Sequence, residues 1–293
     1  AKKSFSAFKV LNDVLFSKDG KTLLCFPGGK EDAYAVPEGV ESIGQYAFVG
    51  CDKVTAITIP NSVTSIGTYA FQNCTALTEI TLPENITTIG NYTFDGCSAL
   101  TTLTFAEGNL LNSIGNNAFY NCGFTSINLP ESLKTIGSNA FQGSALTEIT
   151  IPASVTSLGT SAFTNCLNLT KAVFEEGNPI TALNNQIFSG CTSLSEATLP
   201  AEVKSLGNHF LFGTAITSID LPETLTTIGQ RTFANCVNLA DITIPSGVTS
   251  IGQYAFNNCE SLTQINIPRG VISFDIYTFA GCTSLTEITL HKD

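Results

Sequence analysis

A phenylalanine recurs along this chain at a nearly constant interval, and this interval constrains the fold more than any other feature of the sequence. Successive occurrences lie 23, 23, 25, 22, 22, 25, 22, 23, 23 and 23 residues apart. They are Phe48, Phe71, Phe94, Phe119, Phe141, Phe163, Phe188, Phe210, Phe233, Phe256 and Phe279. A fixed period of roughly 20–50 residues is typical of solenoids, in which each repeat packs mainly against its two neighbours. We therefore predict a stack of about eleven coils of 22–25 residues in place of ordinary domains.

The sequence around each phenylalanine repeats as well, with the consensus L-T-x-I-x-I-P-x-x-V-T-x-I-G-x-x-A-F-x-x-C-x-x. L-T-x-I-x-I alternates apolar and polar residues, which predicts a short strand that the proline ends. V-T-x-I-G predicts a second extended segment whose glycine takes a positive φ at the corner. The Ala-Phe segment predicts a helical or 3₁₀ turn. Because strands this short need neighbours, we predict that equivalent strands of successive coils pair in parallel.

The first residues do not follow the repeat. Residues 14–16 and 21–26 alternate around the turn sequence S-K-D-G, which predicts two strands of a hairpin. We predict that residues 1–31 form an N-terminal β-hairpin cap and that residues 32–293 form the solenoid. At the far end, residues 288–290 predict a last strand whose edge only His291, Lys292 and Asp293 would guard.

Composition and charge exclude several classes of function. With 43% hydrophobic and 13% charged residues, the chain is expected to be ordered. Its net charge of −11 would repel a phosphate backbone, so nucleic acid is not an expected partner. No apolar run approaches the roughly 20 residues that a membrane-spanning helix needs. The start A-K-K-S lacks the apolar core of a signal peptide, which fits either a cytoplasmic protein or a mature chain whose leader is not part of this sequence.

Nine of the ten cysteines form a column three residues after the repeat phenylalanine. They are Cys51, Cys74, Cys97, Cys122, Cys166, Cys191, Cys236, Cys259 and Cys282. Gly143 or Ser144 takes this place in one coil and Gly213 in another, so a small residue suffices there and we predict buried free thiols. Disulfides along the column and a metal ion are the alternatives, although no C-x-x-C pair occurs. The state of Cys25 in the cap is open.

Catalytic patterns are weak in this sequence. It contains 2 histidines, and His209 takes the alanine place before Phe210, where we predict a packing or edge residue. No G-x-S-x-G, Walker loop or H-E-x-x-H occurs. We therefore predict no catalytic site, no cofactor and no metal site.

The repeat resembles the BspA-like, Treponema-type subclass of leucine-rich repeats, whose 23-residue signature matches L-T-x-I-x-I-P, V-T-x-I-G and A-F-x-x-C as they stand here. The resemblance covers nearly the whole chain. It implies a right-handed β-rich superhelix with one parallel sheet on the concave side and short extended or 3₁₀ segments on the convex side. It also implies a secreted or surface-anchored bacterial protein with a role in adhesion, because members of this family are typically displayed on the bacterial surface and some bind host matrix proteins or other bacteria.

The outward positions of the predicted strands form the strongest candidate surface, since the inward positions are committed to the core. This surface is polar and mildly acidic, and Lys171 with Val173 is the only break in the pattern. The candidate contacts are Glu79, Glu148, Lys171, Val173, Glu196, Asp220, Asp241 and Glu287. A plain alternative is that threonine and glutamate simply solvate a sheet and favour strands.

Two other features compete with the strand face. Two coils are longer just after the strand, at residues 107–109 and 175–179, and these rim loops either contact a ligand or are merely tolerated. Tyrosines recur two residues before the phenylalanine near both ends of the array, where they either stack on sugars or cover a corner of the coil. These tyrosines are Tyr46, Tyr69, Tyr92, Tyr254 and Tyr277.

The leading hypothesis is therefore a non-enzymatic adhesion module that binds a protein, from host matrix or from a bacterial surface, on the strand face. The alternatives are a structural spacer that displays another domain and a module that binds glycan through the tyrosines. We expect a monomer. The sequence does not identify the ligand.

Overall fold

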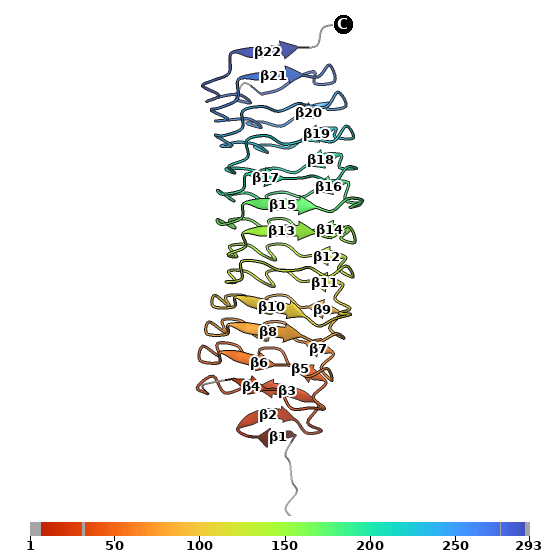
Figure 1. The fold of residues 1–293 in the computed structure, drawn as a ribbon, viewed down its shortest axis with the longest axis vertical. Helices are drawn as coiled ribbons and strands as arrows, with labels where there is room; N and C mark the ends of the chain where they lie inside the picture. The colour runs from red at the N-terminus through yellow and green to blue at the C-terminus, as the bar shows by residue number, and fades with distance from the viewer. Residues whose placement is uncertain (1–6, 31–32, 276, 291–293) are drawn as a thin grey trace, which may run out of the picture. The chain divides into compact units, whose positions relative to one another are not determined.

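The computed structural model describes residues 7–30, 33–275 and 277–290, and within these ranges it contains strands and turns but no helix. The chain divides into two compact units, unit 1 with residues 1–133 and unit 2 with residues 134–293. Each unit is a stack of similar coils (Figure 1). His291, Lys292 and Asp293, which we expected to guard the last strand, lie outside the described residues.

Unit 1 holds two sets of parallel strands and an antiparallel start. Its strands are β1 (Phe8–Leu11), β2 (Val14–Ser17), β3 (Thr22–Cys25), β4 (Tyr34–Ala35), β5 (Ser42–Ile43), β6 (Ala56–Thr58), β7 (Ser65–Ile66), β8 (Glu79–Leu82), β9 (Thr88–Ile89), β10 (Thr102–Phe105) and β11 (Ser113–Ile114). The L-T-x-I-x-I segments form the sheet β4-β6-β8-β10. The V-T-x-I-G segments pair as β5 with β7 and as β9 with β11.

Unit 2 repeats this arrangement with gaps. Its strands are β12 (Thr135–Ile136), β13 (Glu148–Ile151), β14 (Ser157–Leu158), β15 (Lys171–Phe174), β16 (Ala182–Leu183), β17 (Glu196–Ala197), β18 (Ser205–Leu206), β19 (Thr227–Ile228), β20 (Ser250–Ile251), β21 (Gln264–Ile267) and β22 (Glu287–Leu290). The L-T-x-I-x-I segments form β13-β15-β17 and, separately, β21-β22. The resemblance implied one parallel sheet on this side, but the sheet of unit 2 is interrupted between β17 and β21.

The start of unit 1 is antiparallel and leads into the first coil. β2 pairs with β3, and β1, which the sequence did not predict, pairs with the outer edge of β2. β3 then pairs in parallel with β5, so the antiparallel start continues directly into the parallel strands of the coils. The predicted boundary between cap and solenoid stays a prediction, because residues 31–32 lie outside the described residues.

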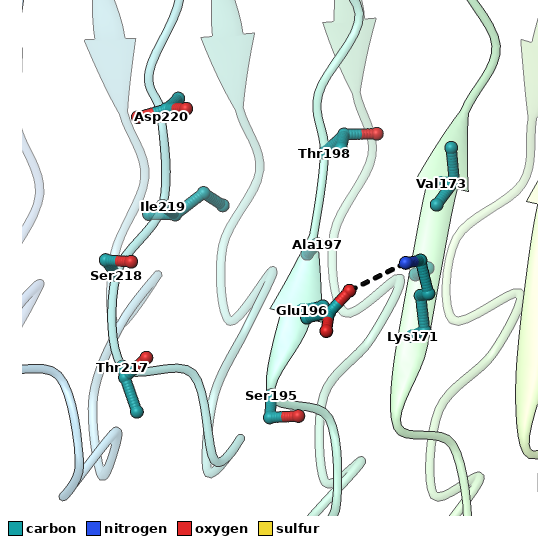
Figure 2. Close-up of a pocket in the computed structure, with 11 residues that line it drawn as sticks. Lys171, Val173, Ser195, Glu196, Ala197, Thr198, Thr217, Ser218, Ile219 and Asp220 are labelled. Carbon is teal, nitrogen blue, oxygen red and sulfur yellow. Dashed lines mark ion pairs between the residues drawn. The ribbon is translucent and has the colours of Figure 1, made fainter.

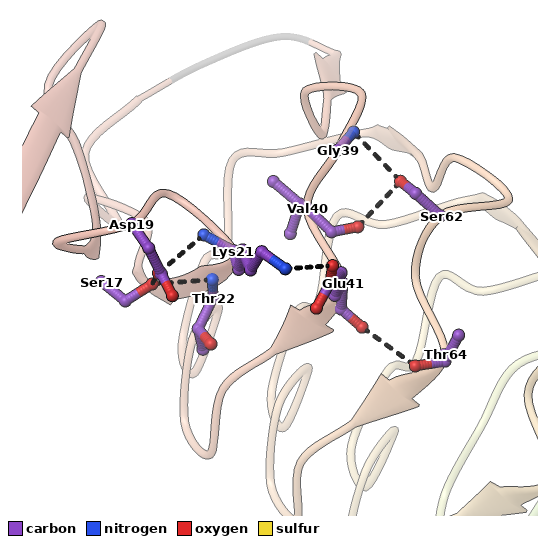
Figure 3. Close-up of polar contacts among 9 residues, drawn as sticks. All are labelled: Ser17, Asp19, Lys21, Thr22, Gly39, Val40, Glu41, Ser62 and Thr64. Carbon is purple, nitrogen blue, oxygen red and sulfur yellow. Dashed lines mark hydrogen bonds and ion pairs between the residues drawn. The ribbon is translucent and has the colours of Figure 1, made fainter.

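Polar contacts tie this start to the first coils (Figure 3). The Lys21 ammonium lies 2.7 Å from a carboxylate oxygen of Glu41. In the next coil, the Ser62 hydroxyl donates to the Val40 carbonyl at 2.8 Å and accepts from the Gly39 N–H at 3.2 Å. The exposed ion pair contributes little stability, whereas the hydroxyl satisfies backbone groups that the turn leaves unpaired.

The core of each unit is a column of stacked phenylalanine rings. In unit 1 the rings of Phe71 and Phe94 lie 5.1 Å apart and nearly parallel, at 3°. In unit 2 Phe163 lies 5.2 Å from Phe141 and 5.5 Å from Phe188. The rings of Phe71 and Phe163 are therefore each covered on both sides by a neighbouring ring, and stacked aromatic pairs contribute roughly 0.5–1.5 kcal/mol beyond burial. This sharing explains why one coil alone would not fold.

The Ala-Phe segment is not the helical or 3₁₀ turn that we predicted. In the coil of Phe71, both Tyr69 and Asn73 have positive φ, 60° and 58°. A right-handed helix needs consecutive residues with negative φ, so two left-handed residues four places apart break the segment into successive tight turns. One such turn is closed by the Gln72 N–H, which donates to the Tyr69 carbonyl at 3.2 Å.

The two left-handed places differ in the residues they accept. The position two residues after the phenylalanine position of each coil holds only glycine or asparagine, which tolerate a left-handed backbone. These residues are Gly50, Asn73, Gly96, Asn121, Gly143, Asn165, Gly190, Gly213, Asn235, Asn258 and Gly281. The left-handed position two residues before the phenylalanine position holds no glycine among the described residues. Its residues are Tyr46, Tyr69, Tyr92, Asn117, Asn139, Ser161, Gln186, His209, Arg231 and Tyr254.

The glycine of V-T-x-I-G does not have the positive φ that we predicted. At Gly252 the reason for glycine is instead the close approach of the preceding coil. A Cβ atom there would lie 2.4 Å from the Gln230 nitrogen and 2.5 Å from the Gly229 carbonyl carbon. This approach lets the Gly252 N–H donate to the Ile228 carbonyl at 2.8 Å.

One coil replaces this glycine with Asn184 and shows what the glycine achieves. There the backbone bond is replaced by the Asn184 side-chain amide, which donates to the Leu158 carbonyl at 2.7 Å. β14 and β16 accordingly belong to different sheets. In this coil the asparagine side chain thus supplies the donor that the backbone supplies where glycine stands.

The eighth coil is shifted by one residue from the alignment that the sequence suggested. Leu211 occupies the phenylalanine place, and Phe210 occupies the alanine place, where its ring meets the preceding column ring at 74° instead of stacking. His209 therefore takes the left-handed place before it, with φ 57°, and not the alanine place. Thr214, not Gly213, stands in the cysteine column, with its hydroxyl 3.4 Å from the next thiol. The sequence suggested the wrong alignment because Phe210 stands next to Leu211, which holds the repeat position.

The prediction of free thiols in the column is confirmed. All ten cysteines are free; Cys25 is exposed, Cys282 is half-buried and the other column members are buried. Each column thiol donates to the carbonyl of the preceding coil, as Cys74 does to Phe48 at 3.1 Å. The column therefore satisfies one backbone acceptor per coil in addition to packing.

We expect Cys25 to react rapidly with an aromatic disulfide reagent in the native protein, Cys282 slowly, and the buried thiols only after unfolding without reductant. The thiolate is the reactive form, and burial raises the pKa of Cys51 to about 12 and that of Cys236 to about 11. The measurement is a thiol count before and after denaturation. Four or five disulfides in a mass spectrum would contradict this account.

Candidate binding face

The strand face consists of the outward positions of the L-T-x-I-x-I segments, and we treat its two parts separately, one in each unit. The inward positions between them are buried, as Ile80 and Ile149 show. The outward positions are exposed, except that Ala56 and Val173 are half-buried. The face therefore presents side chains that the core does not need.

In unit 2 the strand register brings three of the candidate residues together. Glu148 lies opposite Lys171, and Lys171 lies opposite Glu196. The Lys171 ammonium contacts a Glu196 carboxylate oxygen at 2.8 Å, and this hydrogen bond raises the pKa of Lys171. Among the described residues, Glu148 makes no hydrogen bond or ion pair, and its charge contributes to raising the pKa of Lys171.

A hollow of about 370 Å³ separates this group from the next coil (Figure 2). Lys171, Val173 and Glu196 line one side, and Ser218 and Asp220 line the other. The Asp220 carboxylate makes no hydrogen bond or ion pair within the described part of the chain. Glu148 and Glu196 lie on the strands beside Lys171, and Asp220 lies across the hollow (Figure 2), so three carboxylates stand against one ammonium and the local field is negative.

Small residues at inward positions deepen the hollow. Equivalent inward positions in neighbouring coils hold isoleucine, as at Ile149 and Ile219. Ala172 and Ala197 take this place in two successive coils, and both line the hollow. Ala197 is half-buried where its isoleucine counterparts are buried.

The remaining candidate residues lie elsewhere. Asp241 lines a second, smaller hollow of about 220 Å³ together with Gln264. Glu287 lies opposite Gln264 on the last described strand. Glu79 belongs to unit 1, between Ala56 and Thr102. The structure therefore groups Glu148, Lys171, Val173, Glu196 and Asp220, and it does not bring Glu79, Asp241 or Glu287 into that group.

The tyrosine clusters do not offer open ring faces. Tyr69 stacks on Tyr46 at 4.9 Å and on Tyr92 at 4.8 Å. Tyr254 stacks on Tyr277 at 5.0 Å, and the guanidinium of the preceding coil lies 4.9 Å from the ring centre of Tyr254. Because the rings cover one another, a sugar could stack only at an end of each cluster.

The two rim loops are tied down by buried asparagines, which sequence reasoning missed. Asn109 donates to the Pro83 carbonyl at 2.8 Å, and Asn178 donates to the Pro152 carbonyl at 2.9 Å. Both follow a glycine with positive φ in the shared string E-G-N. That shared string is the signal that could have identified them. Within the described residues, no group of three His, Cys, Asp or Glu side chains could hold a metal ion, and no helix could cross a membrane.

Comparisons with known proteins agree with the repeat. The family model of the BspA type leucine-rich repeat region matches residues 25–120, 112–236 and 209–293. A leucine-rich cell surface protein from Faecalibacterium prausnitzii is 26% identical, with 98% of this chain and 95% of that chain covered and a TM-score of 0.53. A leucine-rich repeat protein from Bacteroides ovatus is 26% identical, with 97% and 88% covered and a TM-score of 0.55. A search of curated proteins found no match.

Proposed function

This chain belongs to the BspA-type leucine-rich repeat family, and from that membership we propose that it is a non-enzymatic, protein-binding adhesion module of a bacterial cell surface. Leucine-rich repeats are in general protein-interaction scaffolds. The similar protein from Faecalibacterium prausnitzii is a cell surface protein, which supports the same location for this chain.

The observation that carries the proposal is the group of carboxylates on the strand face of unit 2. Asp220 makes no hydrogen bond or ion pair among the described residues, and the single ammonium of Lys171 interacts with both Glu196 and Glu148. Retaining unpaired acids beside a hollow gains nothing for the core, so a ligand with basic groups is the occupant that this face fits. Glycan binding through the tyrosines is less well supported, because the ring faces are occupied by stacking.

A structural spacer is the second candidate, and it predicts a uniform surface. The strand faces differ, since the hollow at the end of β17 carries the carboxylate of Asp220 where the corresponding hollow of unit 1 carries the amide of Asn128. A spacer would have no reason to keep such a difference. We therefore favour the binding function.

We expect Glu148→Lys with Asp220→Lys to weaken capture of a protein from host-matrix or bacterial-surface extracts by about tenfold, because each exposed charge contributes up to about 1 kcal/mol. Raising the salt from about 0.05 to about 0.5 M should weaken wild-type binding as well. The measurement is surface plasmon resonance with the captured protein.

The control is Glu202→Lys with Glu223→Lys, which makes the same charge change at exposed positions outside the strands of unit 2. Both double variants should keep the wild-type thermal midpoint, since exposed substitutions usually cost within about 0.5 kcal/mol. Equal loss of binding in the two variants would show a general charge effect and remove the strand face as the site.

A further inference from the structure

We propose that the hollow beside β17 is a subsite for a single basic side chain of the protein partner, held by the Asp220 carboxylate and the Ala197 carbonyl. This inference rests on the protein-binding function proposed above. It assigns the hollow beside β17 to a basic side chain of that partner.

The first support is an unpaired strand edge. Within the described residues, no backbone hydrogen bond joins β17 to residues 217–220, and β17 is the last strand of its sheet. The Glu196 N–H donates to the Thr170 carbonyl at 3.1 Å and the Thr198 N–H to the Ala172 carbonyl at 3.0 Å. Since strand residues alternate in direction, the N–H and carbonyl of Ala197 face the hollow. The hollow therefore holds a backbone acceptor that the fold does not use.

The length of the turn before Ser218 does not account for this edge. Ser218 follows Thr214 by 4 residues where Glu196 follows Cys191 by 5, but Glu148 also follows Ser144 by 4 and still pairs with Lys171. The unpaired edge of β17 is therefore a property of the folded coil and not of a shortened turn.

Unit 1 contains the same construction without the charge. Ser126 follows Cys122 by 4 residues, and β10 is the last strand of its sheet. A hollow of about 310 Å³ lies there, lined by Ser126 and Asn128. The two segments read S-I-N-L-P in unit 1 and S-I-D-L-P in unit 2. The hollow of unit 2 therefore differs from that of unit 1 in having the carboxylate of Asp220 where unit 1 has the amide of Asn128.

The chemistry of the unit 2 hollow fits a group with several N–H donors and a positive charge. Asp220 supplies a free carboxylate, Ser218 a hydroxyl and Ala197 a carbonyl oxygen. The ammonium of Lys171 is held at 2.8 Å by Glu196, so its repulsion of a second cation is offset (Figure 2). A guanidinium carries five N–H donors in one plane and can reach a carboxylate and a carbonyl together. The volume of about 370 Å³ is at the lower end of that of ligand pockets.

The test uses a fluorescent pentapeptide with arginine at the centre of four glycines, and the same peptide with neutral citrulline. We expect the wild-type protein to bind the arginine peptide about fivefold more tightly, which corresponds to roughly 1 kcal/mol for a partly exposed charge pair. Amide NMR shifts should change at Ala197 and Asp220. Asp220→Asn should abolish the preference, and this variant should fold because it recreates the unit 1 string.

Two further variants sharpen the result. Asp241→Asn makes the same charge change one coil away and should keep the preference for arginine. Lys171→Met removes a cation and frees Glu196, so it should increase affinity for the arginine peptide about twofold to fivefold. Binding that ignores the charge of the peptide, or an equal loss in Asp220→Asn and Asp241→Asn, would overturn the subsite. If Glu148→Lys alone still weakens capture of the protein in that case, the proposed function stands without the subsite.

Discussion

Phe163→Ala is expected to lower the free energy of unfolding by about 3–5 kcal/mol, because a buried aromatic side chain leaves a cavity that two neighbouring coils share. The Phe163 side chain is fully buried, and its ring is stacked on both sides, against Phe141 at 5.2 Å and Phe188 at 5.5 Å. Urea titration followed by circular dichroism measures the loss. A reduced slope of the transition would indicate that neighbouring coils separate before the rest.

The matched comparison is Phe279→Ala, near the last described strand. Phe279 is half-buried and stacks on Phe256 at 5.7 Å. It shields fewer neighbours, so the loss should be about half of that at Phe163. Equal losses at the two positions would contradict the column of shared rings.

Gly252→Ala is expected to lower the free energy of unfolding by about 3 kcal/mol, the upper range for overpacking, because the added methyl meets backbone atoms. The Gln230 nitrogen would lie 2.4 Å from the new Cβ, and backbone cannot move aside as a side chain can. The preceding coil must separate, and the 2.8 Å bond from the Gly252 N–H to the Ile228 carbonyl would be lost. Thermal and urea unfolding both measure this effect.

Two controls separate close approach from the general effect of replacing glycine. Gly29→Ala adds a methyl where no atom lies within 4 Å, and it should change stability by less than about 0.5 kcal/mol. Gly252→Asn should be less damaging than Gly252→Ala, since its amide can replace the lost donor as Asn184 does for the Leu158 carbonyl. An asparagine variant no more stable than the alanine variant would show that this replacement does not operate at Gly252.

The sequence was sufficient to predict the coils, the parallel strands and the thiol column, because periodic apolar residues determine all three. It failed where the backbone conformation depends on the neighbouring coil. Gly252 looks like a residue chosen for positive φ, yet it is needed for contact with Gln230, which no local pattern reveals. The turn of Tyr69 and Asn73 has helical hydrophobic spacing, but the two left-handed residues that interrupt it can be seen only in three dimensions.

The candidate face was predictable in outline and not in detail. Alternation identified Glu148, Lys171 and Glu196 as outward, and their strands pair in register although 23 residues separate the first two and 25 the last two. The hollow beside β17 was not predictable, because the turn before Ser218 is as long as the turn before Glu148, whose strand does pair with the next coil.

Hydrogen exchange of the protein bound to its captured partner tests the central claim most directly. Contacts with the strand face of unit 2 should slow exchange of the exposed backbone amides in residues 148–151, 171–174, 195–198 and 217–220. Amides in the turns that carry the tyrosines and in the rim loops at 107–109 and 175–179 should exchange as in the free protein. Protection confined to the tyrosine-bearing turns or to the rim loops would contradict a binding face formed by the strands.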